Sequence, residues 1–254
     1  MRVSPSLPLC RETLRVRSFD VDTRGQLRPR ALCAFLQEAA GHDADRRGVG
    51  MARLREQGLA WVLLRLKAEV TQWPAQQEEI VVATWPTRFG GAAAERAFAA
   101  EDASGRTWAR AASLWAVVDL RARRAVRLPA FVRELEVVGQ AAGVSLEPAP
   151  AAAAGSSVGG ERRIEVRRGD LDGLGHVNNI YYLEWGLEAV PEEWLRSHEL
   201  AGFDVVFRRE ARLGDAVVSR ARLGHDERLL HELVAATPAD EVLATLETRW
   251  TRCR

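Results

Sequence analysis

The strongest constraint on this chain is a sequence pattern that occurs twice. The run D-x-D-x-x-G begins at Asp20 and again at Asp170, a spacing of 150 residues. Carried on without a gap, the same spacing places Glu38 over Glu188. An extended segment precedes each run, and an apolar segment with helical periodicity follows it. Self-similarity of this kind predicts two domains of one fold in tandem.

A segment of different composition separates the two copies. Residues 139–160 are mostly Ala, Gly, Pro and Ser, with one charged residue and no aromatic residue. Because such a segment has little apolar surface to bury, it predicts a flexible linker. We therefore expect an N-terminal domain at 1–138 and a C-terminal domain at 161–254. With 47% hydrophobic residues, a chain of 254 residues can build a core in each.

Each half is predicted to form one helix followed by four strands. Apolar residues recur at helical spacing from Leu32 to Ala39, and Asn178 and Asn179 can cap the apolar run 180–187. We expect about three or more turns in each helix. The strands are expected at 59–70, 79–87, 93–101 and 106–120, and at 203–213, 216–223, 229–236 and 242–252. One buried helix wrapped by an antiparallel sheet in each half is an α+β fold.

Charge and composition exclude several classes of function. A formal net charge of +1 provides no broad basic field, so we expect no nucleic acid partner. No stretch is long and apolar enough for a membrane helix, and the first residues lack the pattern of a signal peptide. The cysteines Cys10, Cys33 and Cys253 have no metal-ligand spacing. We therefore expect a cytoplasmic protein with no metal site.

The second copy carries a longer motif than the first. It reads D-L-D-G-L-G-H-V-N-N over 170–179, with Tyr182 and Trp185 in the following helix and F-R-R-E over 207–210. The first half adds L-Q-E-A-A-G at 36–41, G-L-A-W-V-L at 58–63 and A-T-W-P at 83–86. Together these motifs resemble the acyl-acyl carrier protein (acyl-ACP) thioesterases of plants and bacteria. The resemblance implies a tandem (double) hotdog fold and a thioester hydrolase of fatty acid biosynthesis and lipid metabolism. It also implies acyl carrier protein as the partner and no cofactor.

Two positions depart from the family pattern. Leu174 stands two residues before His176, where the family usually has asparagine, and Ala211 stands where plant members have cysteine after the glutamate. Losing the thiol matters little if the carboxyl group does the chemistry. The motif without asparagine is also similar to that of single-hotdog acyl-CoA thioesterases.

The candidate catalytic residues lie only in the second half. Thioester hydrolysis needs an activated water and donors for the developing oxyanion. We expect Glu210, in an apolar strand that would raise its pKa, to activate water. His176 would position the reactants and protonate the leaving thiolate, with Asp172 accepting a hydrogen bond from its ring. The helix N-terminus would supply the oxyanion hole. Gln26 occupies the position of His176 in the first half, so we expect that half to bind rather than catalyse.

Substrate-binding residues are expected in both halves. The candidates are Asn178 beside the catalytic loop and, for the acyl chain, Phe35, Leu36, Ala39, Trp61 and Leu63 of the first half. Asp172 and Asn178 have an alternative interpretation as a turn former and a helix cap. Glu210 could instead pair with a neighbouring arginine.

Three other functions stay open at this point. The chain could act on acyl-CoA, bind an acyl chain without catalysis, or be a dehydratase, which also uses a hotdog histidine. Acyl chain length and the pairing of two chains into a homodimer are not determined by these patterns.

Overall fold

The protein consists of two compact units in a computed structural model. The first unit is formed by Met1–Leu63 and Trp73–Ser145, and the second by Leu64–Gln72 and Leu146–Arg254. The structure describes residues 9–138, 143–147, 156–157, 161–237 and 239–253. Most of the expected linker, 139–160, lies outside the described residues, and the junction between the units falls within it.

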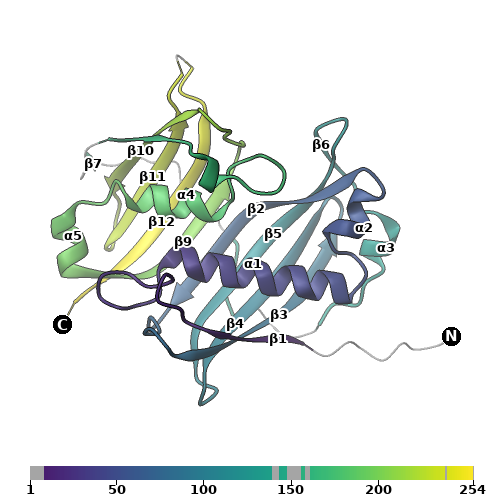
Figure 1. Ribbon diagram of the computed structural model, residues 1–254, viewed down its shortest axis with the longest axis horizontal. Helices are drawn as coiled ribbons and strands as arrows, with labels where there is room; N and C mark the ends of the chain where they lie inside the picture. The colour runs from purple at the N-terminus through teal and green to yellow at the C-terminus, as the bar shows by residue number, and fades with distance from the viewer. Residues whose placement is uncertain (1–8, 139–142, 148–155, 158–160, 238, 254) are drawn as a thin grey trace. The chain divides into compact units, whose positions relative to one another are not determined.

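In the first unit, one long helix lies on an antiparallel sheet (Figure 1). Its elements are β1 (Cys10–Arg15), α1 (Pro29–Arg46), α2 (Met51–Arg55), β2 (Leu59–Val70), β3 (Glu79–Gly90), β4 (Ala93–Asp102), β5 (Thr107–Asp119), β6 (Arg124–Val126) and α3 (Ala130–Arg133). The strand order is β1-β3-β4-β5-β2, with β6 on β5. Proline at the first position of α1 suits a helix start, because its missing N–H would have no intrahelical partner.

The second unit repeats this plan with a shorter helix. Its elements are β7 (Ser156–Ser157), β8 (Arg162–Glu165), a 3₁₀ turn (Arg168–Asp170), α4 (Ile180–Leu187), α5 (Glu192–Ser197), β9 (His198–Phe207), β10 (Ala216–Leu223), β11 (Arg228–Ala235) and β12 (Val242–Arg252). The strand order is β9-β12-β11-β10, with β7 and β8 on β10. The end of β2 belongs to this unit, since residues 65–69 pair antiparallel with residues 202–206 of β9.

The helices bury the faces that the sequence periodicity predicts. Leu32, Leu36 and Ala39 of α1 are at most 2% exposed, and α1 packs on β3 and β1. α4 packs on β10, β11 and β12. At Gly186 a Cβ would meet Leu246 Cδ2 at 2.8 Å, so a larger residue there would require the Leu246 side chain to shift. Within the part of the chain that the structure describes, no helix combines the length and apolar content needed to cross a membrane.

The α+β class is confirmed. The short elements α2, α3, α5 and β6 were not predicted, and among the predicted elements α4 and β9 differ most from expectation. β2, β10 and β12 have the expected bounds. α4 has only eight residues, about two turns. The chain reaches Pro191 four residues later, and the helical conformation is unfavourable for the residue before a proline, so α4 cannot extend to the length of α1. β9 ends at Phe207 instead of residue 213, since Arg208 and Arg209 both donate to the carbonyl of Leu243 and the ladder stops there.

Candidate active site

The D-x-D-x-x-G loop has the same internal geometry in both units. Asp172 Oδ1 accepts from the backbone N–H groups of Leu174 at 2.8 Å and His176 at 3.2 Å. In the first unit, Asp22 Oδ1 accepts from the corresponding N–H groups of Arg24 and Gln26, at 2.8 and 3.1 Å. The glycine of each loop has a positive φ, +79° at residue 175 and +75° at residue 25. This left-handed turn explains why glycine occurs there.

The role of Asp172 therefore differs from the sequence-based expectation. We expected its carboxylate to accept a hydrogen bond from the imidazole ring of His176, but Oδ1 accepts from backbone N–H groups instead. The same bonds form around Asp22, where the loop carries Gln26 and no imidazole. Asp172 thus shapes the loop in the way that Asx turns do.

A second aspartate anchors each loop. Asp170 is 2% exposed and accepts from the backbone N–H of Arg167 at 2.8 Å, and Asp20 accepts from that of Arg17 at 3.0 Å. Both arginine side chains also donate to these carboxylates. The repeated contacts give the loops a common frame, so the chemical difference between the units must come from other residues.

The imidazole of His176 instead contacts Glu210. Nε2 of His176 lies 3.2 Å from Oε2 of Glu210, and the two side chains are 23% and 45% exposed. A bridge between residues 176 and 212 brings the two loops together. Glu210 lies in the loop after β9, not on the strand as expected, and its side chain is about half exposed rather than buried. The structure thus brings Glu210, rather than Asp172, to the imidazole ring.

Neither member of this pair has a counterpart in the first unit. Val177 donates to the carbonyl of Ala211 at 2.9 Å, and Leu27 donates to the carbonyl of Pro74 at 2.8 Å. Ala211 therefore corresponds to Pro74, and Glu210 to the buried Trp73. Gln26 and Trp73 replace the histidine and the glutamate. The second replacement escaped the sequence comparison because the spacing falls from 150 to 137 residues after the helix.

Asn178 lies two residues before the start of α4. Its Oδ1 accepts from the N–H of Ile180 at 3.1 Å, while the N–H groups of Tyr181 and Tyr182 donate to the carbonyls of residues 178 and 179. The N–H groups of residues 180–182 therefore already have acceptors, so an oxyanion hole at the start of the helix would use other donors. The side-chain amide N–H₂ of Asn178 is one such donor.

Hydrogen bonds between a tyrosine hydroxyl and the Glu210 loop were not predicted. Tyr182 of α4 donates to the carbonyl of Arg209 at 3.2 Å and accepts from the N–H of Ala211 at 2.9 Å. Burial raises the pKa of Tyr182 to about 12. The apolar helix pattern indicated that this residue is buried, but it contained no signal for the partners of the hydroxyl.

The acyl-chain candidates lie in the core of the first unit. Phe35, Leu36, Ala39 and Leu63 are at most 7% exposed, and Trp61 donates from Nε1 to the carbonyl of Val49 at 2.8 Å. Phe35, Leu36 and Ala39 lie on α1, which packs on β3 and β1, whereas Trp61 of β2 packs against the cluster that includes Leu54 and Val132.

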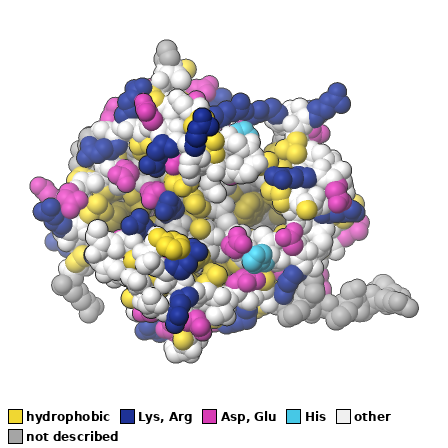
Figure 2. All heavy atoms as spheres, in the orientation of Figure 1, with side chains coloured by type: hydrophobic (Ala, Val, Ile, Leu, Met, Phe, Trp, Pro, Cys, Tyr) yellow, Lys and Arg dark blue, Asp and Glu magenta, His cyan; other side chains and the backbone are white. Residues whose placement is uncertain are grey.

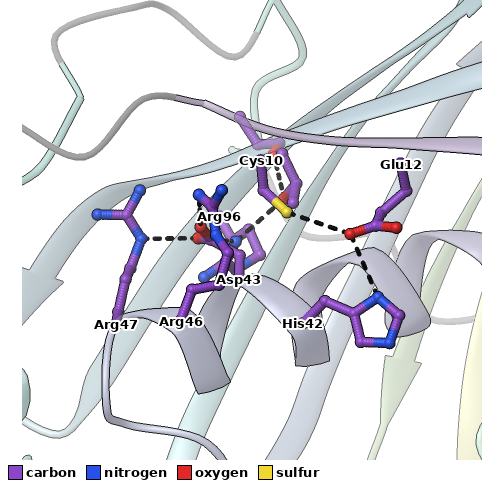
Figure 3. Close-up of polar contacts among 9 residues, drawn as sticks. Cys10, Glu12, His42, Asp43, Arg46, Arg47 and Arg96 are labelled. Atoms are coloured by element: carbon purple, nitrogen blue, oxygen red, sulfur yellow. Dashed lines mark hydrogen bonds and ion pairs between the residues drawn. The ribbon is translucent and has the colours of Figure 1, made fainter.

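A cluster of charged residues lies at the end of α1 (Figure 3). Asp43, with no exposed surface, accepts from Arg47 and Arg96 at 2.8 Å and from Arg46 at 3.1 Å. Burial would raise the pKa of Asp43, but the hydrogen bonds and charges of Arg47 and Arg96 outweigh burial and lower it. Removing one member of such a buried group typically costs about 3–5 kcal/mol. The cluster therefore fastens α1 to β4.

Comparisons with known proteins agree with this architecture. Residues 9–135 match the acyl-ACP thioesterase N-terminal domain, and residues 156–252 match the C-terminal domain of that family. The chain is 29% identical to an oleoyl-acyl carrier protein thioesterase of Arabidopsis thaliana, over 82% of this chain and 61% of the relative. It is 27% identical to a dodecanoyl-[acyl-carrier-protein] hydrolase of Cinnamomum camphora, over 82% and 58%. The chain thus spans about three fifths of these curated relatives, both of which are chloroplastic.

Solved structures share the same fold. An acyl-ACP thioesterase from Bacteroides thetaiotaomicron superposes with a TM-score of 0.85 at 24% identity, covering 96% of this chain and 98% of that one. The 12:0-ACP thioesterase from Umbellularia californica has a TM-score of 0.84 at 22% identity, with the same coverages. The double hotdog expected from the sequence is thereby confirmed. Because both family domains match and together span most of its length, the chain belongs to the acyl-ACP thioesterase family.

Proposed function

We propose that this protein hydrolyses the thioester of acyl-ACP, releasing a free fatty acid and the carrier thiol. The observation that carries the proposal is the pair formed by His176 and Glu210, 3.2 Å apart in the second unit. Membership of the thioesterase family supports it. Acyl carrier protein is the proposed partner, and no metal or other cofactor takes part.

In the proposed mechanism, the pair handles one proton. Glu210 removes a proton from a water molecule as the water oxygen attacks the thioester carbonyl carbon. The C–S bond of the tetrahedral intermediate then breaks, and the proton returns through His176 to the leaving thiolate. The pair ends in its starting protonation state. Contact with Glu210 holds the imidazole, so Asp172 is needed only for the shape of the loop.

Asn178 is the proposed donor to the oxyanion. Its Oδ1 accepts the N–H of Ile180, which fixes the side chain and turns the amide N–H₂ group away from the helix. A preorganised donor of this kind is typically worth about 10²–10³ in kcat. Asn178→Asp keeps the oxygen acceptor but loses the donor. We therefore expect it to lower kcat without uncapping α4.

The first unit is proposed to hold the acyl chain. Phe35, Leu36, Ala39 and Leu63 are buried and apolar, and Trp61 is half-buried. The loop of this unit carries Gln26 where the second unit carries the histidine. Lysine and arginine alternate with acidic side chains over the face in Figure 2. Docking of an acidic carrier would therefore use a local group of arginines and not a general basic field.

Release of free thiol from acyl-ACP tests the proposal directly. We expect turnover of acyl-ACP by the wild type in the presence of EDTA, and a fall in kcat of about 10²–10⁴ in His176→Ala and in Glu210→Gln. The matched control is Gln26→Ala, at the equivalent loop position of the first unit, which should keep wild-type kcat. Binding of acyl-ACP without thiol release would contradict the proposal.

Parallel substrates identify the thiol that is used. The same assay with acyl-CoA of equal chain length should give a much lower kcat/KM than acyl-ACP, because CoA lacks the protein surface of the carrier. A higher kcat/KM with acyl-CoA would show that the protein is an acyl-CoA thioesterase.

A cytoplasmic location and a homodimer are part of the proposal, although the two curated relatives described above are chloroplastic. Cell fractionation tests the location. Sedimentation of the purified chain at several concentrations tests the pairing.

A further inference from the structure

One tyrosine hydroxyl bonds to both peptide groups that flank Glu210. Tyr182 donates to the carbonyl of Arg209 at 3.2 Å and accepts from the N–H of Ala211 at 2.9 Å. Ala211 has no exposed surface, so its N–H would have no water to turn to without this hydroxyl. The loop that carries Glu210 is therefore held on either side of that residue by a single atom.

The tyrosine ring is itself held in place. It is 2% exposed, meets Phe207 edge-on at 5.6 Å and packs against Trp185 at 5.7 Å. Phe207 is the last residue of β9, directly before the Glu210 loop. Because burial raises the pKa of Tyr182 to about 12, the hydroxyl keeps its proton and can donate at neutral pH. The ring thus fixes the hydroxyl relative to both the strand end and the helix.

Ala211 also joins the Glu210 loop to the His176 loop. Its N–H donates to the Tyr182 hydroxyl, and its carbonyl accepts from the N–H of Val177 at 2.9 Å. Val177 is the neighbour of His176. A displacement of Ala211 would therefore change the 3.2 Å contact between His176 Nε2 and Glu210 Oε2.

The first unit keeps the bond between the two loops, from Leu27 to the carbonyl of Pro74, but it lacks the hydroxyl and the groups that the hydroxyl holds. At the position of Tyr182 it has Leu32, which carries no hydroxyl. At the position of Ala211 it has Pro74, which carries no N–H that would need an acceptor. At the positions of the histidine and the glutamate it has Gln26 and Trp73. The hydroxyl thus occurs only in the unit that has a carboxylate to place.

We propose that Tyr182 is a positioning residue for hydrolysis, whose hydroxyl holds the backbone of residues 209–211 so that the Glu210 carboxylate meets the His176 imidazole. The role rests on the proposed function, because it acts through that pair and not on the substrate. Placement errors of about 1 Å typically cost about 10²-fold in rate.

Tyr182→Phe tests this role because it removes one oxygen and keeps the ring. We expect kcat on acyl-ACP to fall about 10- to 100-fold while KM stays within about twofold. The matched control is Tyr181→Phe on the same helix, whose hydroxyl donates to the carbonyl of Gly169 at 3.0 Å, away from the Glu210 loop. The control should keep kcat within about twofold. Equal kcat values for Tyr182→Phe and the wild type would overturn the role.

A second pair of variants separates positioning from stability. Ala211→Pro places at this position the residue type of Pro74 and removes the N–H that Tyr182→Phe would leave without an acceptor. In that background, loss of the hydroxyl still frees the Arg209 carbonyl. We expect the double variant Tyr182→Phe/Ala211→Pro to have about tenfold lower kcat than Ala211→Pro alone. The unfolding midpoints of these two variants should be equal. Equal kcat values would show a purely structural hydroxyl. A wild type inactive on acyl-ACP would overturn the proposed function and this role together.

Discussion

At the residue scale, two loops with the same internal hydrogen bonds carry different side chains. Asp22 and Asp172 accept equivalent backbone N–H groups, yet only the second loop ends in a histidine. The aspartate is therefore explained by the turn, and the imidazole by its contact with Glu210. The aspartate also occurs in the first unit, which lacks the histidine–glutamate pair, so its role is in the fold.

The two loop aspartates should behave alike. Asp172→Asn keeps a side-chain oxygen that can accept the N–H of His176, so we expect at least about half of the wild-type kcat. Asp172→Ala and Asp22→Ala each lose the acceptor and should lower the free energy of unfolding by about 1–3 kcal/mol. Urea unfolding and thiol release measure the two effects. Loss of hydrolysis in a folded Asp172→Asn would show that the carboxylate charge takes part in catalysis.

A buried histidine makes stability depend on pH. His231 of β11 is 1% exposed and bonds to Thr248 at 2.7 Å, and burial lowers its pKa from 6.5 to about 4. Between these values the unfolded chain binds the proton and the folded chain does not, so stability falls as the pH falls from about 6.5 to 4. From pH 7.5 to pH 5 this histidine should remove about 2 kcal/mol.

The contribution of His231 can be isolated by difference. Trp250 of β12 corresponds to Trp115 of β5. With these two strands aligned, the strand pairing gives His231 of β11 the position that Phe98 of β4 has in the first unit. His231→Phe should therefore be accommodated and should lose this part of the pH dependence, measured by urea unfolding at pH 5 and 7.5. Replacing the exposed His225 by Gln should leave the dependence unchanged. An identical pH dependence in His231→Phe and the wild type would contradict the assignment.

At the scale of elements, helix length and helix approach differ between the units. α1 has 18 residues and α4 has eight. The shorter helix lies against its sheet through Gly186, where a Cβ would meet Leu246 at 2.8 Å. Gly41 of α1 has open space at the same atom. The packing of α4 therefore favours glycine at residue 186, whereas the packing of α1 does not require glycine at residue 41.

Two glycine substitutions should have opposite effects. Gly186→Ala forces Leu246 or α4 to move and should lower the free energy of unfolding by about 1–3 kcal/mol. Gly41→Ala gains helix propensity in open space and should raise it by about 0.5–1 kcal/mol. Urea unfolding of both variants at one pH gives the comparison. Stabilisation by Gly186→Ala would mean that α4 does not depend on close approach to β12.

At the scale of the whole molecule, one fold occurs twice with different contents. The second unit has the His176–Glu210 pair, and the first has Gln26 and Trp73 in the corresponding places. The first unit also has the longer helix and the buried Asp43 cluster. This asymmetry supports a division between holding the acyl chain and cleaving the thioester.

Substitution in the first unit should change the choice of substrate. Ala39 of α1 has no exposed surface, and Ala39→Leu adds volume inside that unit. Because packed interiors do not yield readily to added methylenes, the variant should prefer shorter acyl chains. A panel of acyl-ACPs from C8 to C18 measures the profile. Ala189→Leu, at the equivalent buried position of the second unit, is the control and should keep the profile. The same profile in all three proteins would place the acyl chain elsewhere.

The sequence alone determined the tandem fold, because the D-x-D-x-x-G repeat, the helical periodicity and the alternating strands are local patterns that agree with one another. It also singled out His176 and Glu210. Only the tertiary structure decided their contact, because residues 34 apart in the chain meet through the bridge between two loops. Likewise, the partners of Asp172 and the Tyr182 hydroxyl depend on backbone groups that no side-chain pattern records. Hydrophobic periodicity therefore specified the elements, whereas hydrogen bonds between distant loops placed the reacting groups.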